Sequence, residues 1–136
     1  MTTPTTIERL TLTQFLDEII STAPVAPNHS HVLVTAPVGV TARARFSALL
    51  EHVKKLGLDG DGVTVHRTAG RETLTFGNYI TIHFATRRSD YARGWSLIAA
   101  VVDSEMTLGQ LDELQPTFAT TGGRLIRITD GGALWN

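Results

Sequence analysis

Apolar residues along the first third of the chain recur with the period of an amphipathic helix. From Ile7 to Ala23 they fall at roughly helical spacing, which predicts a helix with Thr6 or Thr13 as its N-cap. Two prolines follow at once and end it. A second helix is expected to begin at Thr41 and to end before Gly57. Its apolar residues lie on one side: Phe46, Leu49, Leu50 and Val53.

The remaining pattern is typical of strands. Two runs, 31–37 (HVLVTAP) and 97–102 (LIAAVV), are apolar throughout, which predicts strands of a parallel sheet that are buried on both faces. Three runs alternate at period two, over 63–67, 72–76 and 79–85, and the Gly77-Asn78 pair predicts a hairpin turn between the last two. We also expect a helix over 107–120, interrupted or ended at Pro116, and a last strand over 124–129.

This order of elements predicts an α/β architecture in one domain. Residues 1–6 are expected to be a disordered lead and residues 7–136 the domain. The 136 residues carry a formal net charge of −1 and no cysteine, which excludes disulfides, thiol nucleophiles and thiolate-bound metals. No segment reaches the length of a membrane helix, so we expect no membrane association and a cytoplasmic location.

Several motifs in this order resemble the ATPase domain of phage terminase large subunits and their helicase-like relatives. They are a strand ending VTAP, an Arg-bearing helix, the hairpin TLTFGNYITIHFAT, then ARGWS, LIAAVVDSE and DELQPTFATTGGRLIRIT. Together they span roughly Thr11 to Thr129. The resemblance implies a partial RecA-like, P-loop NTPase-type three-layer fold with a mainly parallel sheet and an inserted β-hairpin.

The functional positions of that family are altered in this chain. A P-loop requires GxxxxGK[ST], and no such string occurs, so we expect a truncated domain that begins just after the phosphate-binding loop. The Walker B strand of the family ends in Asp-Glu, whereas here Ser104 separates Asp103 from Glu105. The sequence therefore predicts vestigial catalytic positions, no cofactor and no ATP hydrolysis by this chain alone. Asp103 and Glu105 either retain weak metal binding or are solvated acidic residues at a strand end.

Five arginines are candidates for contacts with nucleic acid. Arg43 and Arg45 begin the second helix, and Arg87, Arg88 and Arg93 share a loop with Tyr91 and Trp95, where aromatic rings can stack on unpaired bases. The alternative is a solvated loop whose arginines pair with Asp90 and Glu72. His66 and His83 are possible cross-strand neighbours, either as a metal site or as ordinary half-buried strand histidines.

Loss of the P-loop strand would expose the neighbouring strand at the sheet edge. The resemblance places that strand at 124–129, so Arg124, Ile126 and Ile128 are expected at an edge that pairs with another chain. We therefore expect a homo-oligomer. Three functions are compatible with the sequence: a non-catalytic phage protein that binds or regulates a host or phage protein, a nucleic-acid-binding accessory, and one half of a split ATPase whose P-loop comes from another polypeptide.

Overall fold

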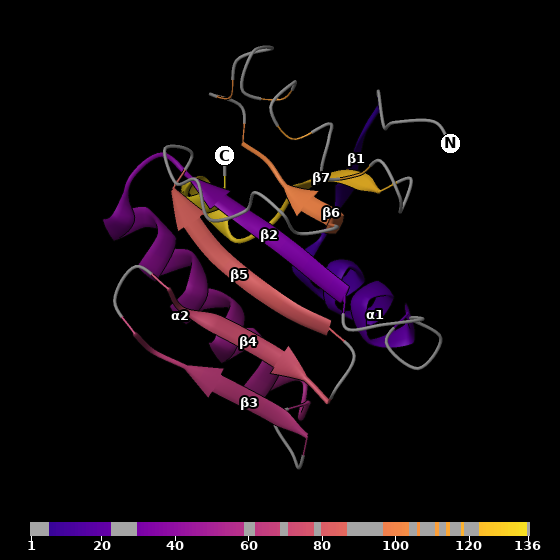
Figure 1. Ribbon diagram of the computed structural model, residues 1–136, viewed down its shortest axis with the longest axis vertical. Helices are drawn as coiled ribbons and strands as arrows, with labels where there is room; N and C mark the ends of the chain where they lie inside the picture. Colours follow the sequence, from indigo (N-terminus) through magenta and orange to yellow (C-terminus); the bar gives the residue numbers. More distant parts are fainter. Residues whose placement is uncertain are drawn as a thin grey trace.

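The computed structural model of the protein describes residues 6–22, 30–58, 62–68, 71–77, 80–86, 97–103, 106, 111, 114, 118 and 123–135. Within these residues, seven strands form one sheet in the order β1-β7-β6-β2-β5-β4-β3 (Figure 1). In chain order, the strands are β1 (Ile7–Leu10), β2 (Ser30–Ala36), β3 (Val63–His66), β4 (Thr73–Phe76), β5 (Ile80–Thr86), β6 (Leu97–Val101) and β7 (Arg124–Ile128).

The sheet changes from parallel to antiparallel at β5. Strands β1, β7, β6, β2 and β5 run parallel to one another, whereas β4 pairs antiparallel with β5 and with β3. The apolar runs expected to be central parallel strands are indeed β2 and β6. The expected hairpin is β4 and β5. Gly77, with φ of 60°, begins its turn, and Asn78 lies outside the described residues.

Both described helices pack on the same face of the sheet. They are α1 (Leu12–Thr22) and α2 (Gly39–Lys55), and Figure 1 shows both behind the strands. Phe15 and Leu16 of α1 and Phe46 and Leu49 of α2 share one apolar core with Val34. This core contains the buried side chains of β2, β4 and β5 that face the helices, so it holds the parallel part and the hairpin part of the sheet together.

A second, smaller core covers the opposite face. It joins side chains of β2, β5, β6 and β7 to Leu114 and Phe118, both buried, with Leu111 packed against them. The rest of the helix expected over 107–120 lies outside the described residues. Neither described helix has the length and apolar character needed to cross a membrane.

The N-terminal helix begins later than the hydrophobic spacing predicts. Residues 7–10 form β1, and α1 starts only at Leu12. Thr11 is the N-cap: its Oγ1 accepts from the Gln14 backbone N–H at 3.1 Å, and its own N–H donates to Gln14 Oε1 at 2.9 Å. This reciprocal pair is a capping box, so neither Thr6 nor Thr13 is the N-cap. β1 is extended because β7 offers it a ladder of backbone partners, which outweighs helix propensity over four residues.

The prediction that the strand at 124–129 lies at an edge of the sheet is also wrong. β7 lies between β1 and β6, and the ladder continues past the strands through a 2.8 Å bond from the Thr129 N–H to the Leu10 carbonyl. Ile126 and Ile128 are buried in the main core, and Arg124 pairs within the chain. The strand beside β7, where the resemblance puts the P-loop strand, is therefore present in this chain. The edges of the described sheet are β1 and β3.

Candidate functional site

The first feature of the site is the junction between β1 and α1. In a P-loop protein a glycine-rich loop connects strand to helix here and surrounds the phosphates with backbone N–H groups. In this chain Thr11 alone connects them. The N–H of Leu12, at the first turn of α1, donates to the Asp130 carboxylate (Oδ1) at 2.7 Å. A side chain of the protein thus occupies the place where a helix N-terminus attracts an external anion.

The turn after β7 holds the Asp130 carboxylate next to the start of α1. Gly131 and Gly132 follow Asp130 with φ of 87° and 76°, the left-handed region that glycine adopts without strain. They turn the chain into the short helix η3 (Gly132–Trp135). A Cβ on Gly131 would lie 2.8 Å from Cδ1 of the buried Trp135, so only glycine fits there without movement of the ring.

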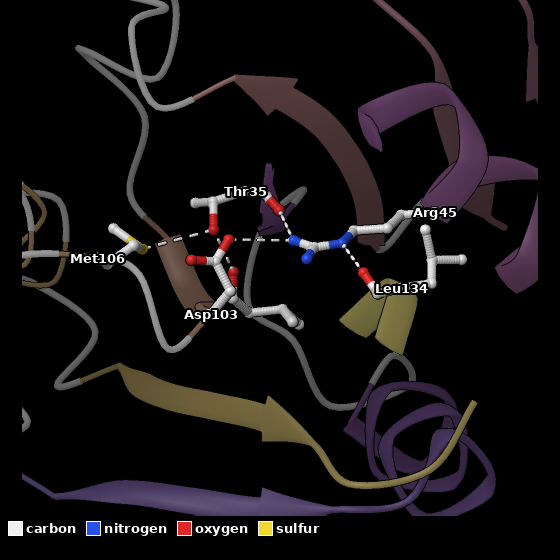
Figure 2. A network of polar contacts seen from close by, with 6 residues as sticks. Thr35, Arg45, Asp103, Met106 and Leu134 are labelled. Atoms are coloured by element: carbon white, nitrogen blue, oxygen red, sulfur yellow. Dashed lines mark hydrogen bonds and ion pairs between the residues drawn. The ribbon is translucent and has the colours of Figure 1, made fainter. Parts of the chain in front are cut away.

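The second feature is a buried ion pair at the carboxyl end of β6. Arg45 Nη1 lies 3.2 Å from Asp103 Oδ2, and the side chains are 2% and 1% exposed (Figure 2). The same Nη1 donates to the Thr35 carbonyl at 2.6 Å, and Nε donates to the Leu134 carbonyl at 2.7 Å. One guanidinium therefore joins β2, α2, η3 and the end of β6.

Neighbouring groups complete this network. The Thr35 hydroxyl donates to the Val101 carbonyl at 2.8 Å and lies 3.5 Å from the Met106 sulfur. The Met106 N–H donates to the Asp103 carbonyl at 3.3 Å. The Arg45 guanidinium also lies 5.6 Å from the centre of the Trp135 ring, within cation–π range. The positive charge that faces Asp103 is thus held in place from several elements.

These residues do not fit a bound magnesium nucleotide. At the described junction of β1 and α1 no loop is present to hold the β- and γ-phosphates, and the first N–H of α1 is bonded to Asp130. A buried arginine neutralises the carboxylate that would organise the metal. What the arrangement does instead is structural. It satisfies buried charges internally and fixes the end of β7 against both helices.

A third polar cluster ties β1 to the rest of the domain. Arg124 of β7 donates through Nε and Nη2 to the two carboxylate oxygens of Glu8, at 2.7 and 2.6 Å, and through Nη2 to Glu18 of α1 at 2.6 Å. The hydrogen bond from Arg124 is the main reason why the pKa of Glu8 is lowered, and the positive charge of Arg124 adds to it. In return, the hydrogen bonds to Glu8 and Glu18 raise the pKa of Arg124.

The structure separates the predicted nucleic-acid contacts. Arg45 is 2% exposed, so the prediction that it contacts nucleic acid is wrong: it sits on the same stripe of α2 as Ala42 and Leu49, facing the core. Arg43 is exposed on α2 and remains a candidate. Three further arginines and one acidic residue lie outside the described residues: Arg87, Arg88, Arg93 and Glu105.

Two signals in the sequence point to parts of this site. Thr11 and Gln14 have the spacing of a capping box and mark where α1 begins. Arg45 lies four residues before Leu49, which places it on the apolar face of α2. Asp130 and Trp135 have no comparable local signal, because their partners are distant in the sequence.

A seven-stranded, mainly parallel sheet with α1 and α2 on one face defines an α/β fold. Solved structures identify the version of that fold. The large terminase ATPase domain of Thermus phage P74-26 matches with a TM-score of 0.62 and 15% sequence identity, over 90% of this chain and 60% of that one. The HK97 bacteriophage large terminase matches with a TM-score of 0.61 and 16% identity, over 90% of this chain and 29% of that one.

A third match is a large terminase from a thermophilic bacteriophage, solved in complex with ADP. Its TM-score is 0.53 and its identity 17%, over 80% of this chain and 27% of that one. No family model and no curated protein matches the sequence. The protein therefore has the RecA-like fold of phage large-terminase ATPase domains, and it spans 60% of the Thermus phage domain.

Proposed function

We propose that this is a non-catalytic phage protein that uses a terminase-like ATPase fold for protein binding or regulation. The observation that carries the proposal is the bond from the first N–H of α1 to Asp130, in the position of the phosphate-binding loop. The buried pair between Arg45 and Asp103 supports it, because the guanidinium supplies the positive charge that a metal ion would supply.

The same geometry favours this proposal over a split ATPase. A P-loop supplied by another polypeptide would have to lie between a strand and the helix that follows it. Here β1 and α1 belong to one chain and are joined through Thr11 alone. Insertion of a loop from outside would also require Leu12 to exchange Asp130 for a phosphate.

Phosphate release from Mg-ATP tests the non-catalytic proposal. The protein, alone and with double-stranded DNA, is expected to release no more phosphate than buffer does. An Asp103→Asn variant is the matched control, because it removes the one described carboxylate at the Walker B position. Hydrolysis by the wild type that Asp103→Asn abolishes would overturn the proposal.

A homo-oligomer remains a prediction, with a different surface from the one expected. β1 is an edge of the described sheet, and its first residue, Ile7, is 36% exposed. A strand from a second copy would extend the ladder at this edge. Light scattering on a sizing column distinguishes the states, and a monomer at every concentration tested would contradict the prediction.

A second candidate function is nucleic-acid binding, favoured by a pair of arginines on neighbouring strands. Arg9 of β1 and Arg127 of β7 are register partners, with Arg9 exposed and Arg127 half-buried. In the described part of the chain neither forms an ion pair. Like charges in directly opposed positions repel, and a phosphate between them would relieve that repulsion.

Fluorescence anisotropy with labelled DNA at several salt concentrations tests this second function. Phosphate contacts predict binding that weakens steeply as salt rises. Replacing both Arg9 and Arg127 with glutamine should reduce the salt dependence, and so should replacing Arg87, Arg88 and Arg93 together. If the anisotropy shows no binding of DNA even at low salt, nucleic-acid binding is excluded.

A further inference from the structure

Two histidines meet on the sheet face opposite the helices. His31 lies near the start of β2 and His83 lies in the middle of β5. In the parallel register His31 is paired with Thr81, and Leu33 is paired with His83, so the histidines are diagonal neighbours two residues apart. The prediction that His66 and His83 are cross-strand neighbours is wrong. Strand β4 lies between β3 and β5, and its Thr73 separates His66 from His83.

The ring nitrogens face each other at short range. His31 Nδ1 and His83 Nε2 are 2.9 Å apart, the ring centres are 5.1 Å apart, and the ring planes are inclined by 36°. Both side chains are half-buried, and the two hydrogen-bonded strands hold the pair in place. In neutral imidazoles this contact needs one nitrogen to carry a proton and the other to accept it.

We propose that His31 and His83 form a chelating site for a divalent transition metal ion. Two imidazole nitrogens bound at about 2.0–2.1 Å with tetrahedral geometry lie roughly 3.3 Å apart. To admit the ion, the rings would separate by a few tenths of an ångström, and each would turn by roughly 35° so that both nitrogen lone pairs point at the metal. The ring that donates the proton would have to lose it from the facing nitrogen before both facing nitrogens can bind the ion.

The donor set selects the class of metal. Imidazole nitrogen suits Zn²⁺, Ni²⁺ and Cu²⁺, whereas Mg²⁺ and Ca²⁺ require oxygen ligands. Among the described residues no group of three or more histidines, cysteines and carboxylates converges on one point. Within that part of the chain the ion would be bound by two protein nitrogens, and water would complete its coordination. Such a site exchanges its ion readily.

The position of the pair gives the metal a structural consequence. β5 is the strand at which the sheet changes from parallel to antiparallel, and its pairing with β2 attaches the β3–β4 extension. An ion bound across β2 and β5 would crosslink that junction. Since the two imidazoles adopt this spacing only in the folded sheet, metal binding should raise the unfolding temperature.

Titration with ZnCl₂, followed by calorimetry and by thermal unfolding, tests the site. Wild-type protein should bind Zn²⁺ and unfold at a higher temperature in its presence, with no response to MgCl₂. His31→Asn and His83→Asn should each weaken binding at least tenfold and remove the thermal shift. His66→Asn is the matched control, because His66 is exposed on β3, and this variant should behave as wild type. Equal Zn²⁺ binding by wild type, His31→Asn and His83→Asn would overturn the proposal.

Electron paramagnetic resonance keeps the test independent of how the variants fold. Wild-type protein with one equivalent of Cu²⁺-iminodiacetate should show hyperfine structure from two imidazole nitrogens. Coordination by one imidazole, or by none, would contradict the chelate.

Discussion

At the scale of single residues, one guanidinium organises the carboxyl end of β6. Arg45 faces Asp103 and also donates to two carbonyls, those of Thr35 and Leu134. Removing one partner of a buried ion pair strongly destabilises the folded protein, because the other charge stays buried without compensation. Arg45 is therefore a structural residue, despite its place among arginines that suggest DNA binding.

We predict that Arg45→Met lowers the free energy of unfolding by about 3–5 kcal/mol. Arg45→Lys should recover little, since one ammonium group cannot reproduce the planar set of donors. Arg43→Met, on the exposed side of the same helix, should change stability by less than ~0.5 kcal/mol. Urea unfolding of the variants measures these differences. A cost for Arg45→Met as small as that of Arg43→Met would show that the ion pair contributes little.

Alanine variants of the two glycines after Asp130 distinguish the cost of backbone strain from the cost of side-chain crowding. Gly132 has positive φ and open space at its Cβ position, whereas a Cβ on Gly131 would contact the Trp135 ring. Gly132→Ala should cost about 1 kcal/mol from backbone strain alone. Gly131→Ala should cost at least ~1 kcal/mol more, because the indole must move. The same unfolding assay measures both, and equal costs would mean that Trp135 yields freely.

At the scale of secondary-structure elements, β1 shows where sequence patterns stop being informative. Ile7 and Leu10 fit a helical spacing and a short strand equally well. The choice is made by β7, more than a hundred residues away, which offers backbone partners and Arg124. Strands β2 and β6 were predictable because a strand that is buried on both faces has an unbroken run of apolar residues. The hydrogen bond between Leu12 and Asp130 was not predictable, because Leu12 contributes only its backbone N–H, which every residue except proline has.

The attachment of β1 should depend on pH through Glu8. Its pKa is lowered in the folded protein, first by the hydrogen bond from Arg124, so its contribution to stability is complete above the unfolded-state pKa near 4.5. That contribution is lost as the pH falls through the folded-state pKa. Glu8→Gln should therefore be less stable than wild type at neutral pH, by about 0.5 kcal/mol since the pair is solvent-screened.

At a pH well below 4.5 the wild type and Glu8→Gln should be equally stable, because the wild-type carboxyl is then protonated. Urea unfolding at the two pH values provides the comparison. Glu51→Gln, at an exposed position of α2, is the control and should show no such difference. A stability gap that persists in acid would indicate that Glu8 acts through packing rather than through its charge.

At the scale of the whole molecule, the RecA-like fold is combined with polar contacts within the chain at the carboxyl ends of its parallel strands. The strand order places β1 beside β7, and the carboxyl ends of β1, β6 and β7 carry Thr11, Asp103 and Asp130. In the related terminase structures the shared feature is the fold, at 15–17% identity. We propose that this chain binds no nucleotide, because Asp130 and Arg45 contact the groups that phosphate and metal would otherwise contact.

Isothermal titration of the protein with Mg-ATP tests this conclusion most directly. An α1 N-terminus that is bonded to Asp130 and joined to β1 through Thr11 alone should give no heat beyond dilution. Asp130→Ala is the informative companion, since it frees the Leu12 N–H without creating a phosphate loop and should also bind no nucleotide. Saturable binding of Mg-ATP by the wild type, strengthened in Asp130→Ala, would contradict the proposal that this chain binds no nucleotide.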